Sequence, residues 1–195
     1  MHTFEVVCRN RSAYPIDAVW ENAQDLEHVA CLHARTNWSF KLIHCVPCSD
    51  GRYPYDTLVF SATRKLAGFI PMSSVGVRRI VGPYEIWQVE FNPLMRVTTR
   101  LRSTLERDPD EPERTKMIDY VQMTVPVVFK ALEGYLREAL RRHTRVQCAE
   151  DEEFRARRQE LLARGIRPPV SLFNLPLWES ETRGLKPAEW RKPAL

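Results

Sequence analysis

A run of short alternating segments followed by a long helical stretch is the strongest constraint on how this chain folds. Between residues 38 and 125, apolar and polar residues alternate, and Gly, Asn and Pro residues separate the segments, as expected for strands joined by turns. The segment RVTTRLRSTLE alternates almost residue by residue, which is typical of antiparallel strands with one face in water. We expect strands at residues 3–8, 38–44, 58–63, 68–72, 75–81, 84–91, 96–105 and 117–125.

Three further stretches have helical character. In residues 17–32, apolar side chains recur at helical spacing and Asp17 is a candidate N-cap. Pro126 precedes a second stretch, 127–143, and a third, 150–163, ends before Gly165. The apolar stripe predicted for the second stretch consists of Val128, Leu132, Tyr135, Leu136, Ala139 and Leu140. This order predicts an α+β fold in which a curved antiparallel sheet wraps around the long C-terminal helix and encloses a pocket.

Composition narrows the class of protein. The 195 residues are 44% hydrophobic and 28% charged, which suits one globular domain. We assign it to residues 1–167, and we expect residues 168–195, with five of the 14 prolines, to form a tail packed on the domain or on a partner. The net charge of +4 comes from Arg interleaved with Glu, which argues against nucleic acid as a partner.

The chain also has no expected membrane segment. No apolar run approaches the roughly 18 residues that span a bilayer, and the first residues lack a signal-peptide core. Five Cys residues without dense spacing suit a reducing compartment, so we expect a cytoplasmic protein. Cys45 and Cys48 form the only Cys-x-x-Cys pair, which we interpret as a strand end and turn rather than as a zinc or redox site.

The segment from residue 22 to residue 33 holds the most informative polar constellation. Asn22, Asp25 and His28 are three residues apart, so a helix places them on one face. There Asp25 can accept a hydrogen bond from His28 and orient its ring. His33 follows five residues later, and both rings can face one metal only if the helix bulges or ends between them. Two imidazoles and one carboxylate suit mononuclear Fe(II), with coordination positions left for O₂ and substrate.

The carboxylate must then come from elsewhere in the chain. Asp151 is the leading candidate, because it lies in CAEDEEF at the expected start of the last helix, which would cross the pocket. Glu150 and Glu152 are alternatives on the same segment, and Asp119 on the preceding strand is a further one.

The predicted architecture resembles the helix-grip fold of the START and Bet v 1-like superfamily, whose members enclose apolar ligands. The Asn22–His33 spacing is similar to the mononuclear-iron motif of the catalytic domain of Rieske non-haem iron oxygenases, which is also a helix-grip domain. This resemblance implies that His28, His33 and Asp151 hold Fe(II). It gives Asp25 an electron-transfer role and places Asn22 near the iron. It also implies hydroxylation or oxidative demethylation of a small apolar or aromatic substrate, and a homo-oligomer.

One departure from that family is large. A Rieske cluster needs two pairs of Cys and His ligands, and this chain holds no such set, so no iron–sulfur cluster is expected in it. An oxygenase reaction would therefore draw electrons from a separate electron-transfer protein or Rieske subunit. The alternative hypothesis is a non-catalytic or cyclase-like protein of the same fold, which binds a hydrophobic ligand and retains the metal motif as a relic.

Two sets of residues are interpreted as structural. We expect the arginines of the last helix to form a solvated face: Arg137, Arg141, Arg142, Arg145, Arg155, Arg157 and Arg158. We expect the aromatic residues to form the core, with the inward ones lining the pocket: Trp38, Phe40, Phe60, Phe69, Trp87, Phe91 and Phe129.

Overall fold

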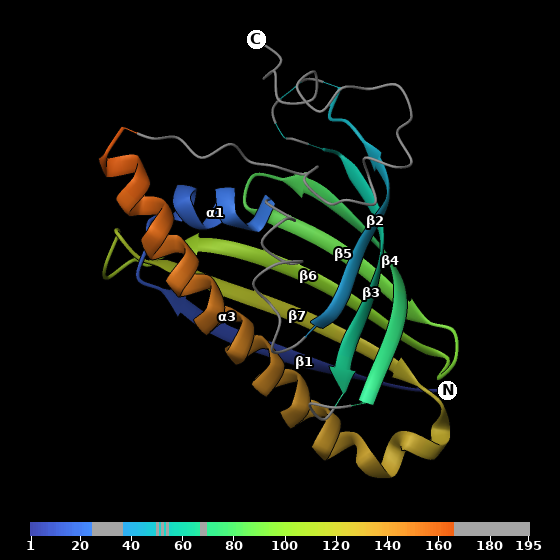
Figure 1. Cartoon of the computed structure of the whole chain (residues 1–195). Coiled ribbons are helices and arrows are strands. Elements are labelled where there is room, and N and C mark those ends of the chain that lie inside the picture. The colour runs from blue at the N-terminus through green and yellow to red at the C-terminus, as the bar shows by residue number, and fades with distance from the viewer. Residues whose placement is uncertain (25–36, 50, 52, 54, 67–69, 166–195) are drawn as a thin grey trace.

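A single curved antiparallel sheet forms the body of the molecule. The computed structural model describes residues 1–24, 37–49, 51, 53, 55–66 and 70–165. Seven strands lie in the order β1-β7-β6-β5-β4-β3-β2, so only the β1–β7 pairing joins strands distant in sequence (Figure 1). The strands are β1 His2–Ser12, β2 Asn37–Val46, β3 Thr57–Leu66, β4 Ile70–Gly82, β5 Glu85–Asn92, β6 Val97–Arg107 and β7 Thr115–Val125.

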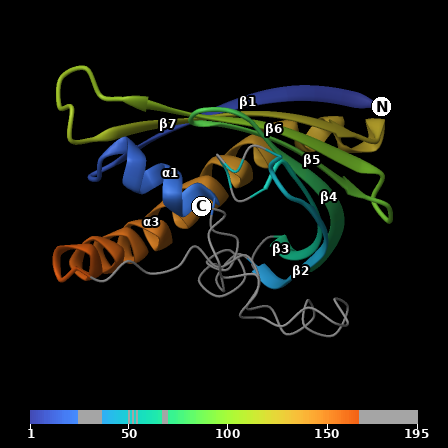
Figure 2. The same ribbon diagram turned by 90° about the horizontal axis from the view of Figure 1, so that it is seen from above.

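The helices lie together on one face of this sheet. Helix α1 spans Ile16–Gln24, the short 3₁₀ helix η1 spans Val127–Leu132, and α3 spans Glu133–Ala163. Figures 1 and 2 show α3 crossing the concave face with α1 beside its C-terminal half. The predicted helix-grip fold, an α+β curved sheet around a long C-terminal helix, is therefore confirmed.

Several predicted boundaries are wrong in an instructive way. The described residues of the expected segments 68–72 and 75–81 belong to one strand, β4, which begins at Ile70 and pairs with β3 without a break in register; residues 68 and 69 lie outside the described part of the chain. The expected helical stretches 127–143 and 150–163 are not two separate helices. Residues 127–132 form η1, and residues 133–163 form the single helix α3, because residues 144–149 contain neither Pro nor Gly to end it. Asp151 therefore lies well inside α3 rather than at a helix start. Asp17 is not an N-cap either, because α1 already begins at Ile16.

Strand alternation decides which side chains form the core. On β1, Phe4, Val6 and Cys8 point inward and are buried, while their neighbours face outward. They belong to a small cluster with Met123 and Val125, against which Leu136 and Leu140 of α3 pack. A larger cluster joins α1 to strands β2–β6 and contains Ile16, Val19, Trp20, Phe40, Leu42, Tyr55, Leu58, Phe60, Ala62, Ile80, Ile86 and Leu105.

Only some of the aromatic residues predicted to form the core are buried. Phe40 and Phe60 are buried and stack with ring centroids 4.9 Å apart. Trp87 and Phe91, by contrast, are 53% and 46% exposed, because their odd positions on β5 face away from the helices. Phe69 and the side chain of Trp38 lie outside the described part of the chain.

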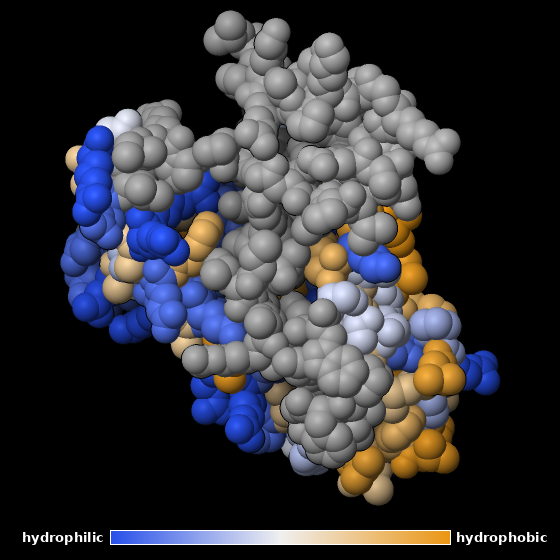
Figure 3. Space-filling view, in the orientation of Figure 1, coloured by the Kyte–Doolittle hydropathy of each residue, from blue (hydrophilic) through white to orange (hydrophobic). Residues whose placement is uncertain are grey.

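The predicted apolar stripe of the C-terminal helix is also only partly buried. Val128, Leu132 and Tyr135 are exposed, since η1 and the first turn of α3 extend past the sheet. Figure 3 shows hydrophobic residues gathered there, at the lower right, whereas the C-terminal half of α3 is hydrophilic.

Candidate functional site

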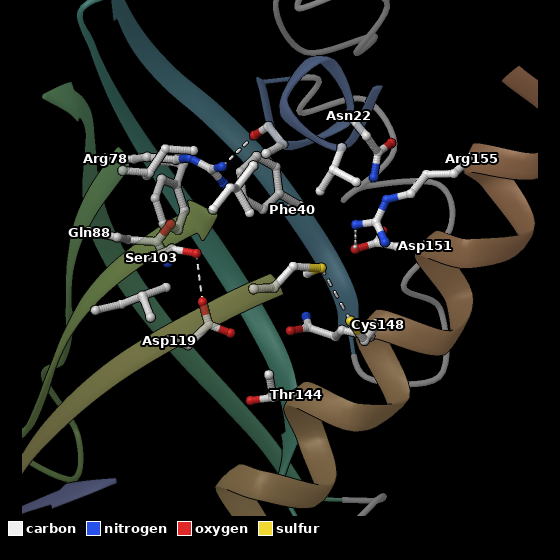
Figure 4. Close-up of a pocket in the computed structure, with 18 of the residues that line it drawn as sticks. Asn22, Phe40, Arg78, Gln88, Ser103, Asp119, Thr144, Cys148, Asp151 and Arg155 are labelled. Atoms are coloured by element: carbon white, nitrogen blue, oxygen red, sulfur yellow. Dashed lines mark hydrogen bonds and ion pairs between the residues drawn. The ribbon is translucent and has the colours of Figure 1, made fainter. Parts of the chain in front are cut away.

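A cavity of about 170 Å³ lies between the concave face of the sheet, α1 and α3 (Figure 4). Its apolar walls come from both sheet and helix and include Val19, Phe40, Phe60, Ile86, Leu105 and Met117. Its polar lining consists of Asn22, Arg64, Arg78, Gln88, Ser103, Asp119, Thr144, Gln147, Asp151 and Arg155. An apolar chamber with a few convergent polar groups is the usual composition of a small-molecule site.

Asp119 on β7 places a carboxyl group in the wall of this cavity. Ser103 lies opposite it on β6, and the Ser103 hydroxyl donates a hydrogen bond of 2.6 Å to Asp119 Oδ1. Desolvation by burial raises the pKa of Asp119, and the charge of Asp151 adds to this effect, while the Ser103 hydrogen bond and Arg78 oppose it. No ion pair joins Asp119 to a cation among the described residues. This carboxyl group therefore keeps its proton to a higher pH than an aspartate in water.

Asp151 on α3 has a different electrostatic environment. Arg155, one turn further along and only 2% exposed, lies 3.3 Å from Asp151 Oδ2. The same guanidinium contacts Glu152 at 2.6 Å. A buried guanidinium that contacts two carboxylates forms charge-assisted hydrogen bonds with both of them. Arg155 and Arg158, 2% and 4% exposed, therefore do not belong to a solvated face as predicted, because α3 turns this side toward α1 and β1.

Asn22 on α1 is buried beside these groups. Its side chain is 1% exposed, and neither its amide nitrogen nor its carbonyl oxygen has a hydrogen-bond partner among the described residues. Leaving a buried amide unsatisfied costs about 1–3 kcal/mol, so such groups usually serve a ligand or water. Asn22 faces the cavity and offers both a donor and an acceptor to its contents.

Arg78 on β4 supplies a positive charge at the same cavity. Its side chain points inward from the sheet and donates a hydrogen bond to the backbone carbonyl of Ala23, while its Nε is buried without a partner. No ion pair joins Arg78 to a carboxylate in the described part of the chain. Arg78 thus places a positive charge in the wall of the cavity.

A second cavity of about 150 Å³ adjoins the first under the middle of the sheet. Its polar wall contains a buried ion pair between Arg64 on β3 and Glu90 on β5. The Ser74 hydroxyl donates a hydrogen bond of 2.9 Å to Glu90 Oε2. Burial alone would raise the pKa of Glu90, but the charge and hydrogen bonds of Arg64, with Ser74 and Gln88, lower it. This carboxylate is therefore charged and already satisfied.

The buried thiols do not supply a nucleophile. Burial raises the pKa of Cys148, in the cavity wall, to about 11, and its Sγ lies 3.7 Å from Met117 Sδ. Burial likewise raises the pKa of Cys45 to about 11. No disulfide joins Cys45 to Cys48. A thiol with a raised pKa behaves as a small hydrophobic group.

The structure brings two of the predicted site residues together. Asn22 and Asp151, 129 positions apart in the printed sequence, line one cavity, as does the alternative Asp119. Asp25, His28 and His33 lie outside the described residues, so their predicted convergence remains a prediction. Glu152 pairs with Arg155, and Glu150 is not part of the cavity lining. Within residues that the structure describes, no group of three His, Cys, Asp or Glu could hold a metal.

Four residues that line the cavity were not predicted as site residues from the sequence: Ser103, Gln88, Arg78 and Arg155. The first three occupy inward positions of β6, β5 and β4, where alternation would otherwise place apolar side chains. A polar residue at an inward strand position is the signal that could have found them.

Comparisons with known proteins agree on the fold. No protein-family model matches the chain, and no curated protein matches it. The Zhui aromatase/cyclase from Streptomyces sp. R1128 has 16% identity over 82% of this chain and 95% of its own, with a TM-score of 0.57. A START superfamily protein from Mycobacterium smegmatis has 11% identity over 75% and 97%, with a TM-score of 0.53.

This chain covers about half of a third structure. The di-domain ARO/CYC BexL from the BE-7585A biosynthetic pathway has 13% identity over 77% of this chain, which spans about half, 49%, of BexL, with a TM-score of 0.60. These similarities support the START/Bet v 1-like part of the expected resemblance, at the level of fold. They give no support to its Rieske oxygenase part. Among the described helices, none is long and apolar enough to cross a membrane.

Proposed function

We propose that this chain binds an apolar small molecule in the cavity beneath α3 and anchors an oxygen atom of this molecule on Arg78. The observation that carries the proposal is the combination of apolar walls with a guanidinium that has no carboxylate partner in the described chain. The similar folds of two aromatase/cyclases and a START protein support a cyclase-like or ligand-binding role. This function corresponds to the hydrophobic-ligand-binding hypothesis that the sequence suggests as the alternative to an iron oxygenase.

The residues suggest how such a ligand is held. Phe40 and Phe60 offer flat apolar surface on one side, and Leu105 and Met117 contribute from the neighbouring strands. Arg78 binds a carbonyl, enol or carboxylate oxygen through a charge-assisted hydrogen bond, which is stronger than a neutral one. Asn22 satisfies a second polar group through its free amide.

The test compares two adjacent arginines of β4. Arg78 faces the cavity, whereas Arg79 is 59% exposed on the outer face and serves as the matched control. Binding of the naphthalene sulfonate 1,8-ANS, an apolar ring system with one anionic group, is followed by fluorescence. We expect Arg78→Met to weaken binding at least tenfold and Arg79→Met to leave it within twofold, in line with 1.5–3 kcal/mol for a hydrogen bond to a charged group. Equal effects of the two variants would contradict the proposal.

An iron site is a second candidate function. Its specific support is that Asn22 and Asp151, two members of the predicted constellation, line one cavity. In that proposal His28, His33 and Asp151 would hold Fe(II), which would supply O₂ activation, and a separate protein would supply the electrons. Arg155 already engages Asp151, so this carboxylate would serve the guanidinium and the metal together.

Metal analysis tests the iron candidate directly. Protein purified without chelator should contain about one equivalent of iron. His28→Ala should lower it, while His44→Ala, on β2, should not. Iron below a tenth of an equivalent that His28→Ala does not change would leave only the ligand-binding function.

A further inference from the structure

An exposed apolar surface lies at the end of the molecule where β7 leads into α3. One of its residues is in the turn between β5 and β6, and the others are in η1 and the first turn of α3. We call this surface the end patch, and it consists of Leu94, Val127, Val128, Leu132 and Tyr135, all of them exposed. Figure 3 shows hydrophobic residues gathered over η1. Apolar side chains that cluster in water usually mark an interaction surface.

The pairing of β6 with β7 brings the two segments of the end patch together. Thr98 on β6 pairs with Thr124 on β7, so the turn before β6 lies beside the segment that follows β7. Met95 of the turn and Phe129 of η1 pack on the same buried cluster. Figure 1 shows the turn and η1 at the same end of the sheet. Phe129 thus packs inward, whereas its neighbour Val128 is 79% exposed.

The first turn of α3 is fixed to β1. Glu133 lies 2.6 Å from the ring nitrogen Nε2 of His2 and 2.6 Å from the guanidinium of Arg137. The Arg137 guanidinium also donates a hydrogen bond to the backbone carbonyl of Glu5 and lies 5.2 Å from the centroid of the Phe4 ring. These contacts hold the end patch on the rigid sheet, in an orientation that leaves it exposed.

The charges around the end patch indicate which kind of partner it fits. Arg96 in the turn and Lys130 in η1 are exposed, and neither forms an ion pair with a carboxylate in the described part of the chain. The acidic residues of the first turns of α3 are already paired, Glu133 with Arg137 and Glu138 with Arg145. A second copy of the chain would add two cations to the interface and no unpaired carboxylate from these turns. An anionic surface would complement the two cations.

We propose that the end patch docks on the surface of a lipid bilayer that contains anionic lipids. Val128 and Leu94 enter the boundary between headgroups and acyl chains, and Tyr135 lies at the level of the headgroups. Lys130 and Arg96 bind the anionic headgroups. Apolar residues next to cations bind a membrane interface in this way without spanning it. The proposal is independent of the ligand-binding function, since no residue of the end patch lines either cavity.

Cosedimentation with vesicles tests the docking. One set of vesicles is phosphatidylcholine alone, and the other contains phosphatidylcholine and phosphatidylglycerol in equal parts. We expect the protein to bind the anionic vesicles at least tenfold more tightly, because each cation near an anionic surface contributes about fivefold. Added salt should weaken this preference, since it screens the attraction between exposed charges.

Matched variants test the residues of the end patch. Val128→Ser and Leu94→Ser should each weaken binding to the anionic vesicles at least fivefold, because each removes apolar surface from the interface. Lys130→Gln should weaken it about fivefold. The controls are Val46→Ser and Lys41→Gln, at exposed positions of the edge strand β2, and they should stay within about twofold. A circular dichroism melt establishes that each variant is folded.

Three outcomes would overturn the proposal. The first is that the unmodified protein does not bind anionic vesicles. The second is that Lys130→Gln weakens binding but Val128→Ser and Leu94→Ser do not, which would mean adsorption by charge alone. The third is a dimer in analytical ultracentrifugation that Val128→Ser dissociates, which would assign the end patch to a second copy of the chain. None of these outcomes affects the proposed role of Arg78, which the fluorescence experiment tests separately.

Discussion

The ring of Phe60 occupies the space in which a side chain at Gly76 would lie. The two residues face each other across β3 and β4, and a Cβ added at Gly76 would overlap the Phe60 ring. Phe60 is 1% exposed, stacks on Phe40 and forms part of the cavity wall. The missing side chain at Gly76 therefore decides where an aromatic wall of the site lies.

Gly76→Ala should destabilise the protein by about 1–3 kcal/mol, because the new methyl group forces the Phe60 ring out of a packed position. Gly82→Ala, at the other end of β4, is the control, since nothing lies within 4 Å of a Cβ there. Urea unfolding measures both. Adding Phe60→Leu to Gly76→Ala should recover part of the loss, and equal costs at Gly76 and Gly82 would contradict the packing argument.

Arg155→Met should lower the free energy of unfolding by about 3 kcal/mol, because it leaves Asp151 and Glu152 without their buried cation. Arg157→Met, at an exposed position of the same helix, should stay within about 0.5 kcal/mol. Thermal or urea denaturation of both variants checks this. An Arg155→Met variant as stable as Arg157→Met would restore the solvated-face interpretation.

The Arg64–Glu90 pair should show strong coupling in a double-mutant cycle of Arg64→Met and Glu90→Gln. The two side chains are 18% and 12% exposed, so water screens their attraction weakly, and we expect a coupling energy of about 2 kcal/mol. The exposed pair Arg114–Glu111 is the control and should give less than about 0.5 kcal/mol. Similar coupling energies in both cycles would show that burial does not strengthen the first pair.

Asp119 should make stability depend on pH. Burial raises its pKa in the folded protein above the ordinary value of 3.8, so the folded state holds this proton to a higher pH than the unfolded chain. Its contribution to stability is therefore complete below that value and is lost as pH rises toward and through the folded pKa. Asp119→Asn has no such proton, so its stability relative to the unmodified protein should increase with pH.

Urea unfolding at several pH values between about 4 and 8 measures this difference. Asp110→Asn, at an exposed carboxylate, is the control and should show no comparable trend. A difference between Asp119→Asn and the unmodified protein that stays constant across the range would mean that Asp119 is ionised throughout.

The overall fold could be predicted from the sequence because its signals are local. Alternation on strands such as β6 and the long helical stretch before Gly165 identify the elements, and their order leaves few ways to pack them. The errors also have local causes. The segments 68–72 and 75–81 look like two strands because polar residues interrupt the apolar pattern, yet backbone pairing with β3 runs without a break from Ile70 to Arg79.

The site was predictable only in part. The spacing of polar residues singled out Asn22, and the requirement for a distant carboxylate singled out Asp151; the two line one cavity. Arg155 was predicted to lie on a solvated helix face, but it is buried. Helical periodicity identifies a charged face and does not show which neighbouring element covers that face. Trp87 was predicted to lie in the core because it is aromatic. Side chains alternate between the two faces of β5, and Trp87 lies on the exposed face.

The amino-acid order by itself determined the helix-grip architecture, since alternation and helical period are properties of neighbouring residues. Only the tertiary structure decided that Arg78 forms no ion pair with a carboxylate in the described chain, that Arg155 pairs with Asp151, and that burial in a cavity wall raises the pKa of Asp119. Protonation and pairing depend on burial and on charges from distant strands and helices, and those distances exist only once the sheet has closed around α3.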